Sequence, residues 1–392
     1  EEKVKLFNQQ YPNVKINFRL FNADYQQTLV TQLAGGSGAD VFRVDIPNIY
    51  PMADQGVLVD LSSRLRDKGH WYNSDDCKKP FYDMLLYRGK MYALACGLDS
   101  NALEFNGTLF DQANVQRPVQ SYADKGWDVN VVLDAAKKLT KRDNGVPTQY
   151  GISTSTSDWM ICPLIWAFGG TNLSADKTTL TWNEDPALQA IQFMADLINV
   201  HKVAPASSGG ESKTFDYTTG KLAMYWSYPS QLIYRYNAKL AWDWDVAPEP
   251  PGSGKTARTA LAWNSWTMYG QGKHLDDAWN YLSFLSGPVA TSVDVGYGWS
   301  MPAFKSLESS YYKRILADFP KKNTKPGNEA FDYSKDWYDP HMQPGWAEAS
   351  QKYITPGLEA VMLGKKTAKQ AVGEFKADVD KLLQAGAARL NG

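Results

Sequence analysis

Alternating strand and helix patterns are the feature of this sequence that most limits its fold. Residues 14–18 alternate between apolar and polar side chains as a strand does, and residues 25–33 carry apolar side chains at the spacing of one helix face. The segment ADVFRVD, residues 39–45, then predicts a second strand. A strand–helix–strand connection this short implies a parallel pair joined by a right-handed crossover. The sequence therefore predicts an α/β fold.

A second α/β pattern begins near residue 107. Asp128 is placed to cap one helix, and Pro186 predicts the start of another. The other elements expected in the rest of the chain are the strand YGISTS at 150–155 and helices at 158–168, 275–285 and 343–392. Because a domain takes roughly 150 residues, the 392 residues of this chain predict two domains.

Polar residues follow two of the predicted strands. Asp45 and Asn48 come after the strand at 39–45, at the edge of an α/β sheet where ligands usually bind. A hairpin is expected to turn at Arg88–Gly89, followed by a loop that contains Asp99 and Ser100. Capping and turn formation explain Asp45 and Asn48 about as well as ligand binding does.

The charge balance and the composition exclude several classes of protein. Lys and Arg number 41 and Asp and Glu 42, so the net charge of -1 lacks the basic footprint of a nucleic-acid binder or of a polybasic membrane-surface protein. We expect no nucleic-acid partner. With 43% hydrophobic and 21% charged residues the chain is typical of globular proteins, and no stretch approaches the ~18 consecutive apolar residues of a membrane span.

The three cysteines are too few for a disulfide scaffold and have no metal-binding spacing. Cys77 and Cys96 flank the predicted hairpin, so a single bridge between them is one alternative, and three separate thiols, with Cys162 as the third, is the other.

No motif in the sequence predicts catalysis or a metal centre. The turn GSGKT at 252–256 resembles the end of a phosphate-binding loop, but Glu249 stands where that loop needs glycine. The chain contains no nucleophile elbow and no dinucleotide fingerprint. The four histidines are scattered without ligand spacing: His70, His201, His274 and His341. We expect no metal, cofactor or catalytic residue, although two carboxylates that meet only in the fold remain an alternative.

Aromatic residues make up 13% of the chain and include 14 Trp. Six of the Trp fall at predicted strand ends or helix starts: Trp159, Trp226, Trp263, Trp266, Trp299 and Trp337. Ordinary burial explains any single one of them, whereas the set favours at least three rings in one cleft. An indole ring covers the apolar face of a sugar, and neighbouring Asp, Asn and Arg side chains bind its hydroxyls. The set predicts a neutral, hydroxyl-rich ligand.

Several segments resemble those of a known family in order and spacing: YPNVKINF, LAGGSGADVFRVD, MADQGVLVDL, RGKMYALACGLDSNALEFN, AFGG and AWNYLSFLSGP. The chain resembles the extracellular solute-binding proteins of ABC sugar importers, the group that includes maltose-binding protein. The resemblance covers nearly the whole chain.

The resemblance implies a two-lobed periplasmic-binding-protein type II fold with a hinge and a cleft between the lobes. The first α/β lobe is expected over 1–105 and 263–305, and the second, with the C-terminal helices, over 106–262 and 306–392. Hinge crossings are expected near Glu104–Asn106, Ala262–Asn264 and Pro302–Lys305. Family members begin with a strand before the first helix, whereas this sequence begins within that helix, so we expect a further N-terminal strand upstream.

The resemblance also places ligand-binding residues in both lobes. Asp158 and Trp159 fall where the family often has an aromatic platform, and Trp226 follows a strand that presents another. The full set of expected contacts is Arg43, Asp45, Asn48, Asp99, Ser100, Asp158, Trp159, Trp226, Trp263, Asn264, Trp266, Trp299 and Trp337.

The function that follows is a non-catalytic, monomeric receptor. It is expected to capture a carbohydrate, with an oligosaccharide favoured, outside the cytoplasmic membrane, in the periplasm or as a lipoprotein. It would then deliver the sugar to the permease subunits of an ABC transporter. The alternatives are a carbohydrate-active enzyme and the same fold with a non-sugar cargo, and Arg43 argues against a cationic one.

Overall fold

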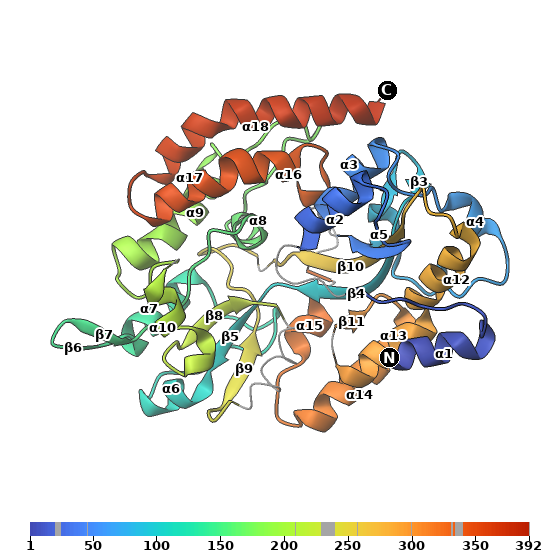
Figure 1. Ribbon diagram of the computed structural model, residues 1–392. Helices are drawn as coiled ribbons and strands as arrows, with labels where there is room; N and C mark the ends of the chain where they lie inside the picture. The colour runs from blue at the N-terminus through green and yellow to red at the C-terminus, as the bar shows by residue number, and fades with distance from the viewer. Residues whose placement is uncertain are drawn as a thin grey trace. The chain divides into compact units, whose positions relative to one another are not determined.

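The computed structural model describes residues 1–19, 25–44, 46–207, 209–228, 240–256, 258–298, 300–330, 332–333 and 340–391 (Figure 1). The chain divides into two compact units, unit 1 (Glu1–Leu98 and Ala262–Asp318) and unit 2 (Asp99–Leu261 and Phe319–Gly392). The chain therefore passes between the units more than once. The domain boundaries expected from the sequence, at 105/106, 262/263 and 305/306, remain a prediction.

The main sheet of unit 1 has the strand order β1 (Val41–Val44), β10 (Leu261–Met268), β4 (Leu94–Ser100) and β11 (Met301–Pro302). Strand β1 runs antiparallel to β10, and β11 runs antiparallel to β4. The helices of unit 1 are α1 (Glu2–Gln10), α2 (Tyr25–Ala34), α3 (Ile46–Asp54), α4 (Ser62–Arg66), α5 (Lys79–Met84), α12 (Leu275–Leu285), α13 (Pro288–Tyr297) and α14 (Lys305–Asp318).

The predicted parallel pair of strands 14–18 and 39–45 is wrong for the part of the chain that the structure describes. Residues 14–19 belong to no strand, and β1 lies at the edge of its sheet, paired with β10. Both segments instead line a cavity of about 370 Å³, to which residues 13–17, residues 38–41 and Tyr281 contribute. Alternating side chains indicate an extended backbone, but a strand also needs a partner for its ladder of hydrogen bonds.

The hairpin expected at Arg88–Gly89 is confirmed. Strands β2 (Leu86–Tyr87) and β3 (Lys90–Met91) pair antiparallel across this two-residue turn. Both turn residues have positive φ, 50° for Arg88 and 71° for Gly89. Two positive φ angles are what a type I′ turn requires, and this turn matches the natural twist of two paired strands.

The main sheet of unit 2 has the order β8 (Met224–Ser227), β5 (Ala102–Asn106) and β9 (Trp244–Ala247), with both pairs antiparallel. A separate hairpin joins β6 (Lys141–Asp143) to β7 (Val146–Gln149). The helices of unit 2 are α6 (Gly107–Gln112), α7 (Val129–Leu139), α8 (Asp158–Ala167), α9 (Asp185–Asn199), α10 (Gly210–Thr214), α15 (Lys325–Glu329), α16 (Trp346–Ala349), α17 (Thr355–Met362) and α18 (Ala368–Asn391).

Local signals predicted several helices of both units correctly. Asp128 accepts hydrogen bonds from the backbone N–H groups of Asn130 and Val131 at the start of α7, so the predicted cap is confirmed. Pro186 is the second residue of α9, and α12 has the predicted bounds. The strand expected at 150–155 is reduced to a single bridge between Tyr150 and Leu222, because the next two backbone N–H groups both donate to the carbonyl oxygen of Val203.

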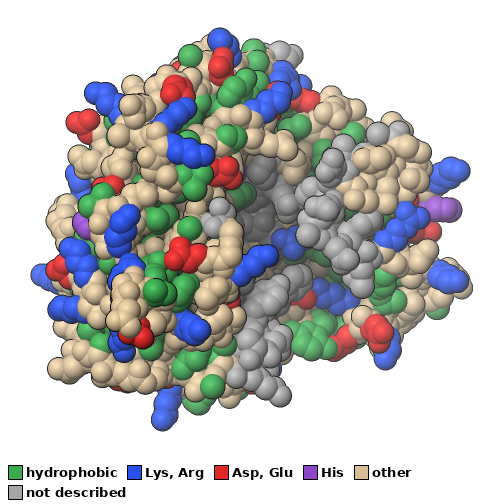
Figure 2. Space-filling view, turned by 60° about the vertical axis from the view of Figure 1, so that its left-hand side comes forward, with side chains coloured by type: hydrophobic (Ala, Val, Ile, Leu, Met, Phe, Trp, Pro, Cys, Tyr) green, Lys and Arg blue, Asp and Glu red, His purple; other side chains and the backbone are tan. Residues whose placement is uncertain are grey.

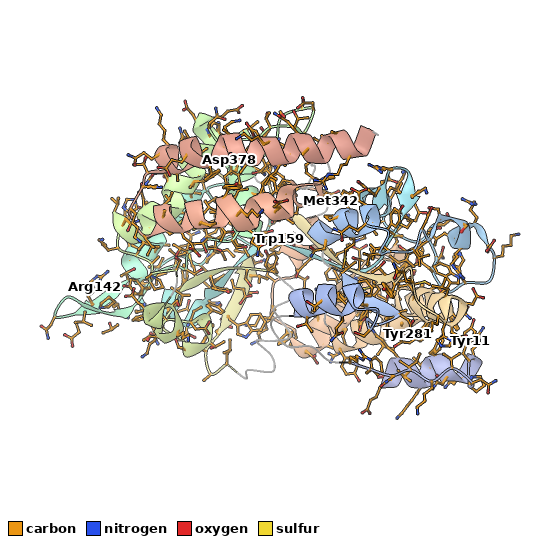
Figure 3. All side chains as sticks on the ribbon, turned by 45° about the horizontal axis from the view of Figure 1, so that its top comes forward. Tyr11, Arg142, Trp159, Tyr281, Met342 and Asp378 are labelled. Carbon is orange, nitrogen blue, oxygen red and sulfur yellow. The ribbon has the colours of Figure 1, made fainter. Side chains whose placement is uncertain are left out.

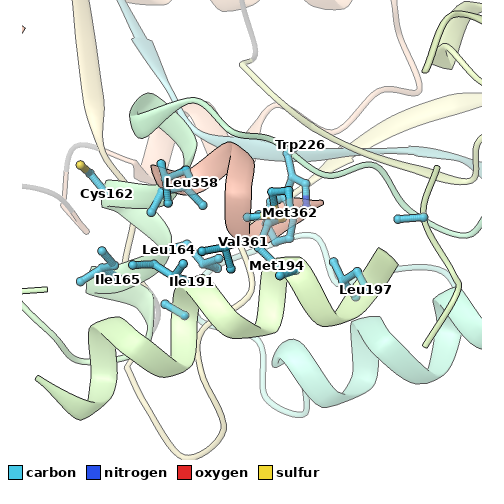
Figure 4. Packing of buried hydrophobic residues seen from close by; sticks show 14 of the residues in the cluster. Cys162, Leu164, Ile165, Ile191, Met194, Leu197, Trp226, Leu358, Val361 and Met362 are labelled. Carbon is cyan, nitrogen blue, oxygen red and sulfur yellow. The ribbon is translucent and has the colours of Figure 1, made fainter. Parts of the chain in front are cut away.

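The core of unit 2 packs α8 and α9 against the C-terminal helices (Figure 4). Helix α18 contributes Phe375, Val379 and Leu383, and the carboxylate of Asp380 accepts a hydrogen bond of 2.7 Å from the backbone N–H of Leu180. The core of unit 1 is built around Phe7, with α12 on one side. Each unit therefore has a hydrophobic interior of its own.

The three cysteines, Cys77, Cys96 and Cys162, are buried and unbridged. Burial raises the pKa of the Cys96 thiol to about 11. Within the described ranges, no helix combines the length and the hydropathy that a membrane crossing requires. The same residues include no group of three His, Cys, Asp or Glu side chains placed to hold a metal ion.

Candidate ligand-binding site

Asp158, the first residue of α8, is a buried carboxylate at which three segments of unit 2 meet. The indole N–H of Trp346 donates to its Oδ2 over 2.9 Å, and Nε2 of His341 lies 3.3 Å from the same oxygen. The side chain of Ser350 also hydrogen-bonds this carboxylate. Asp158 is 6% exposed, so these contacts replace the water that the carboxylate loses on folding. The residue therefore fixes the amino end of α8 to the segment 340–350.

The electrostatics of this cluster favour the ionised carboxylate. Burial raises the pKa of Asp158, but the charge and hydrogen bond of His341, with the hydrogen bonds of Ser350 and Trp346, outweigh it and lower the pKa to about 2. Asp158 therefore stays ionised at neutral pH in the folded protein, with Nε2 of His341 3.3 Å from its Oδ2.

Trp159 lies directly on the imidazole of His341. Its ring is stacked on the imidazole of His341, with 3.6 Å between ring centroids and 10° between ring planes. The indole is partly exposed, although its neighbour Asp158 is buried. Figure 3 labels Trp159 together with Met342, the residue that follows His341. The arrangement presents a flat aromatic surface whose orientation is set by the protein.

The backbone of Trp159 is anchored from the other side of unit 2. The amide of Asn101 donates to the carbonyl oxygen of Trp159 over 3.3 Å and to the sulfur of Met160 over 3.2 Å. Asn101 is itself buried, and its carbonyl oxygen accepts a hydrogen bond of 3.0 Å from the hydroxyl of Thr259. The start of α8 is therefore tied to the link between β4 and β5.

A second buried acid of unit 2, Glu249, behaves in the opposite way to Asp158. Glu249 is 1% exposed, and burial raises its pKa well above the ordinary value, offset in part by a hydrogen bond with Thr259. The difference follows from the partners, because His341, Ser350 and Trp346 all lower the pKa of Asp158, whereas only the hydroxyl of Thr259 lowers that of Glu249.

Trp226, expected to be an aromatic platform, lies in the hydrophobic core instead. It is 5% exposed and packs in the same cluster as Met194, Val361 and Met362 (Figure 4). Its backbone N–H donates to the hydroxyl of Ser153 over 3.1 Å. The buried ring of Trp226 therefore packs in the core. The ligand contact expected of Trp226 remains a prediction.

In unit 1, Arg43 and Trp266 are brought together. They are directly opposite each other in the ladder between β1 and β10, and both are partly buried. Trp266 also packs against the cluster around Phe7. Asn48 lies in the first turn of α3 and is partly exposed. The ligand contacts expected of Arg43, Asn48 and Trp266 remain predictions.

Asp99 and Ser100 lie in strand β4 rather than in the predicted loop. Strand β4 extends to Ser100, which is buried, whereas Asp99 is partly exposed. The carboxylate of Asp99 accepts the backbone N–H of Ser100 over 3.1 Å. The predicted loop is wrong because β4 continues through both residues before β5 begins at Ala102.

The remaining predicted residues lie outside the part of the structure that is described. Asp45, Trp299 and Trp337 are outside the described ranges. Trp263 and Asn264 belong to β10, but their side chains are outside the description.

Sequence reasoning missed His341, Trp346 and Asn101, which hold Trp159 in place. His341 has no motif around it, and it meets Trp159 only through the fold of unit 2. The spacing of Trp346 and Ser350, four residues apart, was the available signal that these two side chains share one helix face.

The visible surface shows Lys and Arg side chains interspersed with Asp and Glu (Figure 2). No broad field of one sign appears on this face, in agreement with the net charge of -1.

The model of one family, bacterial extracellular solute-binding proteins, matches residues 1–292. The erythritol/L-threitol-binding protein of Mycolicibacterium smegmatis is 25% identical over 363 residues, which cover 80% of this chain and 72% of that protein. An ABC substrate-binding protein from Listeria monocytogenes, solved in complex with cycloalternan, has a TM-score of 0.83 at 24% identity and covers 97% of this chain and 94% of its own.

A further solved structure, UgpB from Mycobacterium tuberculosis in complex with glycerophosphocholine, has a TM-score of 0.80 at 19% identity and covers 98% of this chain and 94% of its own. These likenesses confirm the predicted fold class, the α/β two-lobed fold of periplasmic solute-binding proteins.

Proposed function

Because the chain belongs to the family of bacterial extracellular solute-binding proteins, we propose that it captures a carbohydrate outside the cytoplasmic membrane and delivers it to an ABC permease. The protein acts as a monomer and without a cofactor, and it releases its ligand unchanged. An oligosaccharide is the favoured class of ligand. A similar structure solved in complex with cycloalternan supports this choice, and an erythritol/L-threitol-binding relative supports a neutral, hydroxyl-rich ligand more generally.

The observation that carries the proposal is the flat, partly exposed ring of Trp159 at the amino end of α8. An indole face packs against the C–H face of a sugar ring at small entropic cost, because a Trp side chain has few torsions to freeze. Asp99, also in unit 2, is partly exposed and carries a carboxylate that suits hydroxyls.

Ligand class is tested by thermal unfolding against a panel of erythritol, monosaccharides, linear and cyclic oligosaccharides, and glycerophosphocholine. We expect an oligosaccharide to raise the apparent stability most, since a ligand at 100 times its Kd adds about 2.7 kcal/mol. Glycerophosphocholine as the sole stabiliser would replace the carbohydrate proposal with a non-sugar cargo. Turnover of an oligosaccharide, seen as products by chromatography, would replace it with an enzyme.

Replacing Trp159 with Ala is expected to weaken binding of the best carbohydrate by about 1 to 3 kcal/mol, because one stacked face of the ligand loses its partner. Titration calorimetry measures the change. Trp242 is the matched control, since it is another partly exposed Trp of unit 2 with an edge contact to Tyr217, at 4.8 Å. Trp242→Ala should leave affinity unchanged, and equal affinity of the Trp159→Ala and unmodified proteins would remove Trp159 from the site.

A further inference from the structure

The two faces of the Trp159 ring are not equivalent. A centroid separation of 3.6 Å with ring planes 10° apart is van der Waals contact, so no ligand atom fits between Trp159 and His341. The indole is nevertheless partly exposed. The stacked contact with His341 therefore leaves only the ring edge and the opposite face of the indole for a ligand.

His341 is held firmly in this position. It is 3% exposed, its Nε2 lies 3.3 Å from Asp158, and the edge of its ring contacts Trp346 at 5.6 Å between centroids. Trp346 donates to the same carboxylate oxygen that His341 approaches. The carboxylate of Asp158 thus contacts both the imidazole of His341 and the indole of Trp346. The imidazole in turn fixes the orientation of the Trp159 ring.

We propose that His341 is a positioning residue that closes one face of Trp159 and presents the opposite face as a single stacking surface for one sugar ring. The proposal rests on the proposed function and adds a residue to its site. A ring whose plane is fixed before the ligand arrives loses little rotamer freedom on binding, and this preorganisation increases affinity. His341 itself touches no ligand, because its exposed fraction is too small and its stacked face is covered.

The test is a double-mutant cycle between His341 and Trp159, measured by titration calorimetry with the best carbohydrate from the panel. His341→Ala should weaken binding about three- to tenfold in the unmodified protein, the loss expected when one aromatic contact no longer orients another. The same substitution should have no effect in the Trp159→Ala background, because His341 acts through that ring. His341→Gln, whose flat amide can stack and still donate to Asp158, should keep affinity within about twofold of the unmodified value.

A second readout needs no ligand. Acrylamide quenching of the Trp159 emission, obtained as the difference between each protein and its Trp159→Phe counterpart, should increase in His341→Ala and stay low in His341→Gln. This increase reports the opening of the closed face, and an unchanged far-UV circular dichroism spectrum distinguishes it from unfolding.

Two outcomes would overturn the role of His341 and leave the proposed function intact. In the first, His341→Ala weakens binding equally with and without Trp159. In the second, His341→Ala keeps full affinity and unchanged quenching. Failure of every carbohydrate to bind the unmodified protein would overturn the proposed function, and the role of His341 in binding would fall with it.

Discussion

Trp226→Ala should lower the free energy of unfolding of unit 2 by about 3 to 5 kcal/mol, the usual cost of emptying a large aromatic site in a core. Trp226 is 5% exposed and belongs to the same buried cluster as Met194 of α9 and Val361 and Met362 of α17, so removal of its ring leaves a cavity in the core. Urea unfolding followed by far-UV circular dichroism measures the change.

Trp242→Ala again serves as the control, because Trp242 is partly exposed and the removal of its ring leaves a surface depression rather than a cavity. We expect its effect on unfolding to be clearly smaller. A loss below about 1 kcal/mol for Trp226→Ala would show that the ring does not fill the core, and would restore the interpretation of Trp226 as a ligand platform.

Asp158→Asn is expected to destabilise the protein by an amount that depends on pH. The folded pKa of Asp158 is lowered to about 2 from an ordinary value near 3.8, so the ionised form stabilises the folded state. At about 1.4 kcal/mol per pKa unit, the shift corresponds to roughly 2 kcal/mol. Because the pKa is lowered on folding, this contribution is complete above pH 4 and disappears as the pH falls from about 4 to 2.

The measurement is the difference in unfolding free energy between the unmodified protein and Asp158→Asn, taken at a series of pH values. The difference should be constant from pH 5 to 7 and should shrink below pH 4. Asp185→Asn, which removes an exposed carboxylate from the first turn of α9, controls for the general loss of one negative charge. A difference that is independent of pH down to pH 2 would contradict the lowered pKa of Asp158.

Elements with strong local signals could be predicted from the sequence. The turn at Arg88–Gly89, the Asp128 cap and the helix Leu275–Leu285 each depend on side chains within a few residues of the feature. Such local interactions form in the same way whatever the rest of the fold is. The strand expected at 14–18 failed because it needed a partner, which alternation alone does not supply.

The candidate site was predicted less completely than the fold, because burial is decided by distant residues. Trp159 and Trp226 carry the same local signal, each beside a predicted helix start or strand end, yet one is partly exposed and the other lies in the core. The contacts that distinguish them come from His341 and Trp346 for the first and from α9 and α17 for the second. No spacing rule joins residues that far apart.

Helix α18 has a practical consequence for anyone who attaches a label or a reporter domain to this protein. Three of its side chains are integral to the interior of unit 2, and Asp380 fastens it to Leu180. A shortened version that ends before Ala368 would expose a hydrophobic groove along α9 and α17. An exposed apolar surface of this kind promotes aggregation. A reporter domain should therefore be attached through a flexible linker that leaves the whole of α18, Ala368–Asn391, packed against the core of unit 2.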